Sequence, residues 1–309
     1  LLDIPYGKRP ARRMLACRLR GDRKETVMQT RPINILVTID RNYLPHFATM
    51  LYSLLASNPT GRFSVYVMNS TLTEDDLAYA RRIIGDRGEI HLVRVAEDGL
   101  ADAPTTDRYP REMYYRIFAA EYLPRELDRV LYLDPDMIIN GSLGELYDMQ
   151  MGTAFFAAAS HIGSLLHFFN ELRLDMDEES PYINSGVMLM DLQRLREEQD
   201  TDDVFDYIES HRGKLLLPDQ DIISGLYGDR IIPLDPYRYN MTERLYMLHR
   251  QSGGCMDLDH VRRTAAVIHY CGRNKPWRQN YIGRLDVFYR ETVAALARDF
   301  PEDTDEIRA

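Results

Sequence analysis

The chain has 309 residues, of which 45% are hydrophobic, and a formal net charge of −10 at pH 7. This length allows one large core or two lobes, and the negative charge argues against nucleic acid as the main partner. Because no stretch of about 18 apolar residues occurs, we expect no membrane-spanning helix. The three cysteines form neither an even set nor a close-spaced pair, which favours a reducing compartment and hence the cytoplasm.

The first 31 residues are strongly basic, with nine lysine and arginine residues against three acidic ones. This segment lacks the apolar core of a secretory signal. A basic arm could contact acidic lipid or polymer, but we favour a disordered extension over residues 1–30, or sequence read through ahead of a start at Met28. The folded domain is therefore expected to begin near Arg31.

Short apolar runs alternate with helical patterns through the first half of the chain. Strands are expected at residues 34–39, 63–68, 89–95 and 129–133, because these runs are β-branched and apolar. Helices are expected at 44–57, at 71–84 with Thr73 as its cap, and at 110–122. This alternation is typical of an α/β protein with a mainly parallel sheet and helices on both faces. Ligands of such sheets bind beyond the carboxyl ends of the strands.

The second half is less regular. Strands are expected at 154–159, 182–190, 231–234 and 266–269, and residues 160–181 read as irregular or helical. Helices are expected at 191–196, at 202–211, at 217–227 with Asp219 as its cap, and at 282–298. No repeat or Gly/Ser linker divides the chain, so we expect one domain over residues 31–281, followed by an amphipathic helix and an acidic tail over 282–309.

Two carboxylates follow the strand expected at 129–133, in the sequence Asp134-Pro135-Asp136. Placed one residue apart at a strand end they can reach a common point, and hard oxygen ligands suit Mn²⁺ or Mg²⁺. A solvated turn is the simpler explanation, because Asp and Pro both favour turns. The buried strand ahead of the pair favours a metal site, since charges at the edge of a core are costly unless they are paired or metal-bound.

A second polar group ends the strand expected at 266–269. His269 could be a third metal ligand, Gly272 allows a backbone to come close, and Lys275 could offset the charge of a diphosphate. Taken singly, His269 is more often a structural histidine and Trp277 a packing residue. The three residue types at this spacing favour a site when they are taken together.

These motifs carry a resemblance to a known family. Asp134-Pro135-Asp136 with His269, Gly272, Lys275 and the following Pro-Trp resembles glycosyltransferase family 8. The similarity covers most of the chain, and four further stretches match in order, at residues 38–43, 115–117, 182–187 and 218–221. The resemblance implies a GT-A fold, which is a Rossmann-like architecture with a mixed, mainly parallel sheet. It also implies retaining, metal-dependent transfer of glucose or galactose, as in enzymes that build lipopolysaccharide and lipooligosaccharide.

The resemblance implies a role for each matching residue. Asp134, Asp136 and His269 would bind Mn²⁺, with Mg²⁺ as the alternative. Gly272 and Lys275 would contact the diphosphate of a UDP-hexose. The remaining donor contacts would come from Thr38, Asp40, Asn42, Tyr43, Arg116, Asp134, Asn184, Asp219 and Gln220, with Asp40 and Asn42 at the uridine.

Two routes to retention of configuration stay open. A double displacement would need a carboxylate on the β-face of the sugar, and Asp219 is its candidate nucleophile. The matching position nearest the reacting face carries Gln220, which is an amide and a poor nucleophile. We therefore favour same-face attack beside Asp134, in which the leaving phosphate takes the proton of the acceptor. The metal would act as a Lewis acid on the diphosphate and Lys275 would add positive charge.

Three other functions compete with a transferase. A phosphatase would be expected to place its Asp-x-Asp after the first strand, whereas this pair follows the fourth. A nucleotidyltransferase would need a glycine-rich loop after the first strand, and residues 38–45 contain no glycine. A UDP-sugar-binding protein without turnover would be expected to lose some of the site, yet Asp134, Asp136, His269 and Lys275 are all present.

Several features stay open at this level. Glucose and galactose differ at one hydroxyl, and the acceptor is either a saccharide or a lipid-linked saccharide. The apolar side chains of the helix expected at 282–298 suit packing on the core or contact with a membrane surface. We expect a cytoplasmic protein, with peripheral contact at the inner membrane face as the second reading. No feature of the sequence defines the oligomeric state.

Overall fold

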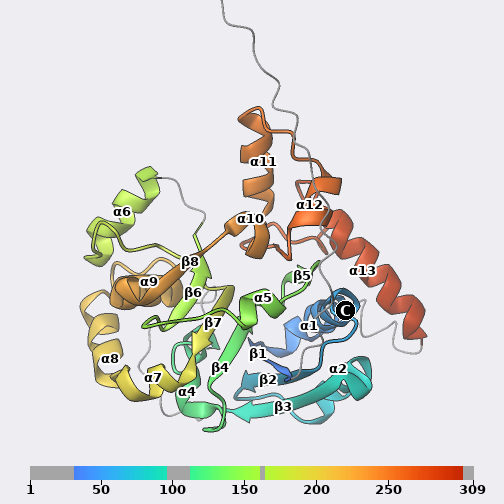
Figure 1. The fold of residues 1–309 in the computed structure, drawn as a ribbon, viewed down its shortest axis with the longest axis horizontal. Helices are drawn as coiled ribbons and strands as arrows, with labels where there is room; N and C mark the ends of the chain where they lie inside the picture. Colours follow the sequence, from blue (N-terminus) through green and yellow to red (C-terminus); the bar gives the residue numbers. More distant parts are fainter. Residues whose placement is uncertain (1–30, 96–111, 161–163, 302–309) are drawn as a thin grey trace, which may run out of the picture.

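The computed structural model describes residues 31–95, 112–160 and 164–301, and the basic segment 1–30 and the tail 302–309 lie outside this range. Seven strands form the central sheet in the order β3-β2-β1-β4-β7-β6-β8 (Figure 1). Their bounds are β1 Ile33–Thr38, β2 Phe63–Asn69, β3 Gly88–Arg94, β4 Arg129–Leu133, β6 Phe156–Ala159, β7 Val187–Asp191 and β8 Ile231–Leu234. All neighbours pair in parallel except those of β7, which runs against β4 and β6. The expected mainly parallel sheet is confirmed.

Helices cover both faces of this sheet. Successive residues of β1 point to opposite sides, as strand geometry requires: Ile35 and Val37 join one core cluster and Leu36 joins the other. The first cluster includes residues of α1 Leu44–Ser57, α2 Ala78–Ile84 and α13 Asp286–Asp299. The second includes residues of α3 Glu112–Tyr115, α4 Ala119–Tyr122, α7 Leu192–Glu198, α8 Thr201–Ser210 and α9 Pro218–Tyr227.

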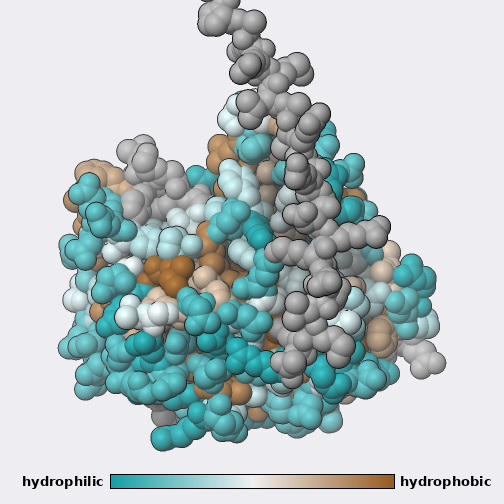
Figure 2. Space-filling model, viewed as in Figure 1, coloured by the Kyte–Doolittle hydropathy of each residue, from teal (hydrophilic) through white to brown (hydrophobic). Residues whose placement is uncertain are grey.

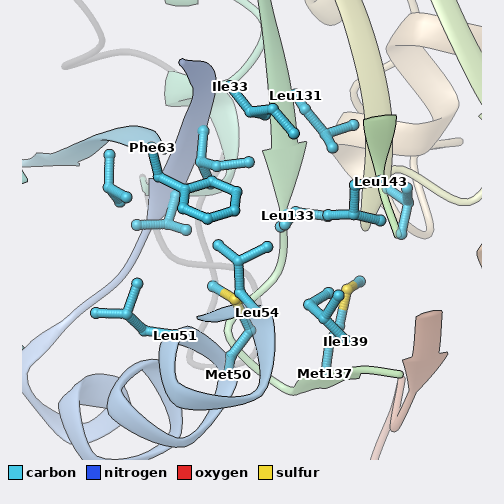
Figure 3. Packing of buried hydrophobic residues seen from close by; sticks show 14 of the residues in the cluster. Ile33, Met50, Leu51, Leu54, Phe63, Leu131, Leu133, Met137, Ile139 and Leu143 are labelled. Carbon is cyan, nitrogen blue, oxygen red and sulfur yellow. The ribbon is translucent and has the colours of Figure 1, made fainter. Parts of the chain in front are cut away.

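Helix α1 shows how the first face is held. Met50, Leu51 and Leu54 are fully buried and point from α1 toward the sheet residues Ile33 and Leu133 (Figure 3). Their spacing of three and four residues places them on one face of the helix. Fully burying one such side chain contributes about 1.5–3 kcal/mol.

A small second sheet connects the central sheet to a helical cap. Strands β5 Met137–Ile139 and β9 Val267–His269 pair antiparallel, with Met137 opposite His269. Met241 and Ile268 pair across an isolated bridge beside them. The cap consists of α10 Pro236–Tyr239, α11 Glu243–Gln251 and α12 Leu258–Thr264 (Figure 1). Asp134-Pro135-Asp136 is thus the link between the two sheets.

The remaining elements are short. They are α5 Gly144–Tyr147, α6 Ser164–Leu174 and the 3₁₀ helices η1 Arg41–Tyr43, η2 Asp75–Leu77, η3 Gly85–Arg87 and η5 Gly228–Arg230. The last long helix, α13, packs on the core, because Phe288, Tyr289 and Leu296 are buried. Among the described residues, no helix has the length and apolar character needed to cross a membrane.

Four element predictions were wrong in part. The helix expected at 110–122 is interrupted between α3 and α4, and the helix expected at 71–84 opens as η2. The strand expected at 182–190 begins only at Val187, and the helix expected from 282 begins at Asp286. The helices of the cap, α10 to α12, were not predicted. Two of these misses involve backbone N–H groups that donate to distant side chains, those of Ile183 to Ser224 and of Arg284 and Leu285 to Glu243, which periodicity does not reveal.

Candidate active site

Three ligand-type side chains meet where the two sheets join. Asp134 and Asp136 leave the carboxyl end of β4, and the register of β5 with β9 brings His269 beside them. His269 Nε2 lies 3.6 Å from Asp134 Oδ2 and 3.3 Å from Asp136 Oδ1. The three candidate ligand atoms all lie within 4.8 Å of one another. Two carboxylates and one imidazole form a donor set suited to Mn²⁺ or Mg²⁺.

Two of these atoms are buried without a hydrogen-bond partner. Asp136 Oδ1 and His269 Nε2 face each other across 3.3 Å, and neither has a hydrogen-bond partner in the described structure. Buried polar atoms are almost always paired, so an orphaned pair requires an explanation. A cation bound between them would satisfy both atoms. The residues present therefore fit the divalent ion that the sequence predicts.

Gly186 makes room for this arrangement. A Cβ at Gly186 would lie 2.4 Å from His269 Cε1 and 2.8 Å from Asp134 Oδ2. The backbone also contributes, since Asp134 N–H donates to the Gly186 carbonyl at 2.8 Å. A glycine is thus needed here for close approach and not for its backbone angles.

Lys275 lies against the carboxylate pair. Its Nζ donates to Asp136 Oδ2 and, at 2.9 Å, to the carbonyl of Tyr270. Burial acts to raise the pKa of Asp136, but Lys275 and His269 outweigh it and hold that pKa well below its usual range. Burial acts to lower the pKa of Lys275, and Asp136 raises it overall. Both groups are therefore charged at neutral pH.

A buried guanidinium joins the two aspartate motifs. Arg116 sits in the break between α3 and α4, and its Nη1 lies 3.1 Å from Asp134 Oδ1 and 3.1 Å from Asp219 Oδ2. The ring of Tyr132 stacks beneath it at 4.2 Å, and the Tyr132 hydroxyl donates to Asp134 Oδ1 at 2.7 Å. Asp219 also accepts from Ser185 Oγ at 2.6 Å. The guanidinium of Arg116 thus couples the position of Asp134 to that of Asp219.

Asp219 does not cap its helix, contrary to expectation. The capping position just before α9 is held by Leu217, which makes no side-chain cap, so Asp219 lies within the first turn. Asp219 turns toward Arg116 instead, and its burial raises its pKa although Arg116 acts in the opposite direction. The backbone N–H groups of Leu216 and Leu217 donate to Asp221, at 2.6 and 3.0 Å.

These groups line a cavity of about 390 Å³. From the predicted set, its wall includes Thr38, Asp40, Tyr43, Arg116, Asp134, Asp136, Asn184, Asp219, Gln220, His269, Gly272 and Lys275. Asn42 is the exception: it is exposed and reaches the wall only through a 3.4 Å hydrogen bond to Asp40. Gly272 has φ of +79°, a conformation that favours glycine. The sequence therefore identified a set of residues that the fold brings together, with Asn42 outside the lining.

Asn240 belongs to the site but was not predicted. Its Oδ1 lies 2.8 Å from His269 Nδ1, and its Nδ2 donates to Asn184 Oδ1 at 2.7 Å. Asn184 in turn donates to Gln220 Oε1 at 2.7 Å. The signal was hidden because Asn240 lies in an irregular turn between α10 and α11, where asparagine is common. Tyr132 and Ser185 were missed as site residues too, since both lie next to residues that carried the motifs.

Trp277 is a packing residue, as the sequence suggested when the residue is taken singly. Its ring stacks on His46 with centroids 3.6 Å apart, and Lys275 Nζ lies 5.5 Å from the Trp277 ring. His46 Nδ1 lies 2.8 Å from the hydroxyl of Tyr289 on α13. The loop that carries Gly272 and Lys275 is therefore held between α1 and α13.

The fold and the site together define a glycosyltransferase with a GT-A fold. A family model described as Glycosyl transferase family 8 matches residues 34–281, and the chain belongs to this family.

Several characterised proteins are similar to this chain. The lipopolysaccharide 1,2-glucosyltransferase of Escherichia coli is 26% identical over 247 residues, which cover 79% of this chain and 73% of that protein. General stress protein A of Bacillus subtilis is 25% identical over 266 residues, covering 84% and 90%. The crystal structure of galactosyltransferase LgtC with donor and acceptor sugar analogues has a TM-score of 0.74 at 23% identity and covers 85% and 96%. This last likeness concerns the fold.

Proposed function

We propose that the chain is a metal-dependent retaining hexosyltransferase, which moves glucose or galactose from a UDP-sugar to a saccharide or lipid-linked acceptor. One observation carries the proposal. The two buried, unpartnered atoms of Asp136 and His269 face each other in the wall of a cavity that also contains Lys275 and Arg116. The site can take a metal ion between Asp136 and His269, and the positive side chains of Lys275 and Arg116 lie beside it. Such a concentration of positive charge suits a diphosphate leaving group better than it suits a neutral ligand.

Asp134, Asp136 and His269 would hold the ion. When bound, a divalent ion at these residues supplies positive charge that stabilises the departing diphosphate. Lys275 is charged, buried and adjacent to Asp136, so a phosphate oxygen brought to this point meets a fixed ammonium group. Tyr43 and Asp40 line the same cavity and are the proposed contacts of the uridine, with Asn42 at its outer edge.

The hydrogen bonds of Asp219 favour same-face attack. Its Oδ2 is already engaged by Arg116 at 3.1 Å and by Ser185 at 2.6 Å, and both interactions withdraw the electron density that a nucleophile needs. Gln220 is held through its Oε1 by Asn184. In the proposed step the acceptor oxygen bonds to the anomeric carbon while the bond to the phosphate oxygen breaks. The acceptor's proton passes to the leaving phosphate.

The relatives suggest a class of acceptor. Two E. coli relatives are named lipopolysaccharide 1,2-glucosyltransferases, and a Salmonella typhimurium relative is named lipopolysaccharide 1,3-galactosyltransferase. We therefore propose a glycolipid or envelope saccharide as the acceptor, and action in the cytoplasm at the inner face of the membrane. The same names include both hexoses, so glucose and galactose both stay candidates.

The donor can be identified by UDP release. The purified chain would be incubated with a panel of UDP-sugars, first with Mn²⁺ and then with a chelator. Metal-dependent release from one UDP-hexose, lost in Asp136→Ala, would support the proposal and name the sugar. Metal-dependent UDP binding without release from any donor, with or without saccharide acceptors, would instead support a UDP-sugar-binding protein.

A further inference from the structure

Four buried side chains form a continuous hydrogen-bonded chain from the metal site to the sugar-facing amide. The chain runs from His269 to Asn240, then to Asn184 and finally to Gln220, with successive distances of 2.8, 2.7 and 2.7 Å. All four residues are at most 9% exposed. Bulk water is therefore excluded from most of the chain, and each amide must satisfy its neighbour.

One backbone group fixes the direction of every bond in this chain. The N–H of Gly186 donates to Asn184 Oδ1 at 3.3 Å, and a backbone N–H can only donate. The amide oxygen of Asn184 must therefore face Gly186 and Asn240, so Asn240 must present its NH₂ group to Asn184. The oxygen of Asn240 then faces His269. In the other direction, the NH₂ group of Asn184 faces Gln220, which must present its oxygen.

This polarity dictates which nitrogen of a neutral imidazole carries the hydrogen. With Asn240 Oδ1 as its partner, His269 Nδ1 must carry the hydrogen, because an oxygen lone pair cannot bond to a nitrogen lone pair. A neutral imidazole then has its free lone pair on Nε2. Nε2 is the atom that lies 3.6 Å from Asp134 and 3.3 Å from Asp136. The lone pair is thus directed at the point where the three ligands converge.

We propose that Asn240 is a positioning residue that serves both halves of the site, since it sets the tautomer of His269 for metal binding and the orientation of Asn184 and Gln220 for the sugar. Metal-ligating histidines generally need a partner for their second nitrogen, and the partner's loss costs about 10–100-fold in metal affinity. In Asn240 the two roles belong to different atoms of one amide group, so they can be tested separately. The oxygen of Asn240 serves His269, and the nitrogen serves Asn184.

Two substitutions test the two groups independently. Asn240→Asp keeps an acceptor for His269 Nδ1–H but removes the donor to Asn184, whereas Asn240→Ala removes both. The inference rests on the proposed function for its metal, so the first readout needs no metal. The ¹⁵N chemical shifts of His269 in the metal-free protein, assigned by the signals lost in His269→Gln, report which nitrogen carries hydrogen. Mn²⁺ binding followed by electron paramagnetic resonance and the KM for the UDP-sugar are the other readouts.

With the pH raised until the imidazole is neutral, we expect the Nδ1–H tautomer in the wild-type chain and in Asn240→Asp, and a mixture of tautomers in Asn240→Ala. The Mn²⁺ dissociation constant should rise about 10–100-fold in Asn240→Ala and stay near the wild-type value in Asn240→Asp. In Asn240→Asp the KM for the UDP-sugar should rise, because Asn184 would then face a carboxylate. Asn58 provides a matched control: it is buried, it donates to the carbonyl of Leu54 and it lies away from the cavity.

Asn58→Ala should lower stability while leaving the tautomer and Mn²⁺ affinity unchanged. An Nε2–H tautomer in the metal-free wild type would overturn the inference, whatever the function of the chain. Equal losses of Mn²⁺ affinity in Asn240→Ala and Asn240→Asp would also overturn it, because a purely structural asparagine would behave in this way. If wild-type tautomerism is as expected but the wild type binds no Mn²⁺, the proposed function fails and the role of Asn240 in metal binding fails with it.

Discussion

The Cα of Gly186 lies so close to the imidazole of His269 that an added Cβ would come within 2.4 Å of His269 Cε1. Gly186 immediately precedes β7, and His269 ends β9 on the second sheet. At the proposed metal site, the absence of one side chain therefore allows the central sheet and the small sheet to approach this closely. Since Asp134 Oδ2 would lie 2.8 Å from the same Cβ, any larger residue displaces two proposed ligands at once.

Gly186→Ala is expected to weaken the site more than the fold. Overpacking of a close-packed region costs about 1–3 kcal/mol, which chemical denaturation would measure. Mn²⁺ affinity should fall by at least about tenfold, since misplaced ligands lose coordination energy. Gly213→Ala is the control, because Gly213 is exposed and its Cβ would meet nothing within 4 Å. Wild-type Mn²⁺ affinity in Gly186→Ala would contradict the role of this contact.

Arg116→Met should destabilise the chain by about 3–5 kcal/mol, because it leaves buried carboxylates without their cation. The side chains of Arg116 and Asp219 are 8% and 4% exposed. Adding Asp219→Asn to Arg116→Met should recover part of this loss, since one uncompensated charge is removed. Urea denaturation of the two single variants and the double variant gives the coupling energy.

A matched control for this cycle is Arg194→Met on α7. Arg194 pairs with Glu198 one turn away, and both side chains are about a third exposed. Such a pair contributes about 0.3–0.5 kcal/mol. If Arg116→Met cost no more than Arg194→Met, Arg116 would not be the structural link between Asp134 and Asp219.

Asp221 should control the position of Asp219 and Gln220 without lining the cavity itself. It is fully buried and accepts from Arg173 at 2.6 and 2.8 Å, from Tyr182 at 2.7 Å and from two backbone N–H groups. Asp221→Asn is expected to cost about 3–5 kcal/mol, because the buried guanidinium loses its counter-charge. The KM for the UDP-sugar should rise as the start of α9 shifts.

Asp206→Asn on the exposed face of α8 is the control for Asp221→Asn and should change stability by less than about 0.5 kcal/mol. Steady-state kinetics on both variants measures the KM for the UDP-sugar, which should rise only in Asp221→Asn. An Asp221→Asn chain that lost stability but kept the wild-type KM would show that Asp221 supports the fold alone.

Stability should also depend on His46 in weakly acidic solution. Burial lowers the pKa of His46 from 6.5 to about 4, while Asp136 acts to raise it and Lys275 to lower it. The unfolded chain therefore binds a proton at this residue between pH 6.5 and 4, and the folded chain does not. Unfolding is thus favoured as the pH falls through this window, by at most about 2 kcal/mol after allowance for partial exposure.

His46→Phe keeps an aromatic ring against Trp277 and removes the titration. The free energy of unfolding of the wild type should fall more steeply between pH 6.5 and 4 than that of His46→Phe, as followed by urea denaturation at each pH. Identical pH dependence in the two chains would show that His46 is protonated equally in the folded and unfolded states.

Much of the fold could be predicted because the spacing of apolar residues along the sequence indicates which face of each helix or strand is buried. Helix α1 was predicted with both ends correct, since its apolar residues recur on one face. Strand β4 was likewise predicted with both ends correct. The parallel sheet followed from the alternation of such elements, and its carboxyl edge gave the location of Asp134 and Asp136.

Several of the errors lie at the site, where local preferences yield to long-range bonds. Residues 182–186 look like a strand, but the N–H of Ile183 donates to Ser224 Oγ and that of Asn184 to the carbonyl of Ala159. Asp219 was expected to cap its helix, but it lies inside the first turn of α9 and bonds to Arg116, which is distant in the sequence. Asn240 carries no sequence signal, because its role depends on His269, 29 residues away. Such contacts are defined only once the chain is folded.

The central claim is that Asp134, Asp136 and His269 hold a divalent ion that binds the nucleotide of the donor. The most direct measurement is calorimetric titration of UDP into the wild-type chain with Mn²⁺, repeated with a chelator and with Asp136→Asn. Asp136→Asn keeps the size of the side chain and removes the charge that the ion needs. We predict UDP binding that requires Mn²⁺ and is lost in the variant. UDP binding of equal strength with chelator, or no binding under any of these conditions, would contradict the account.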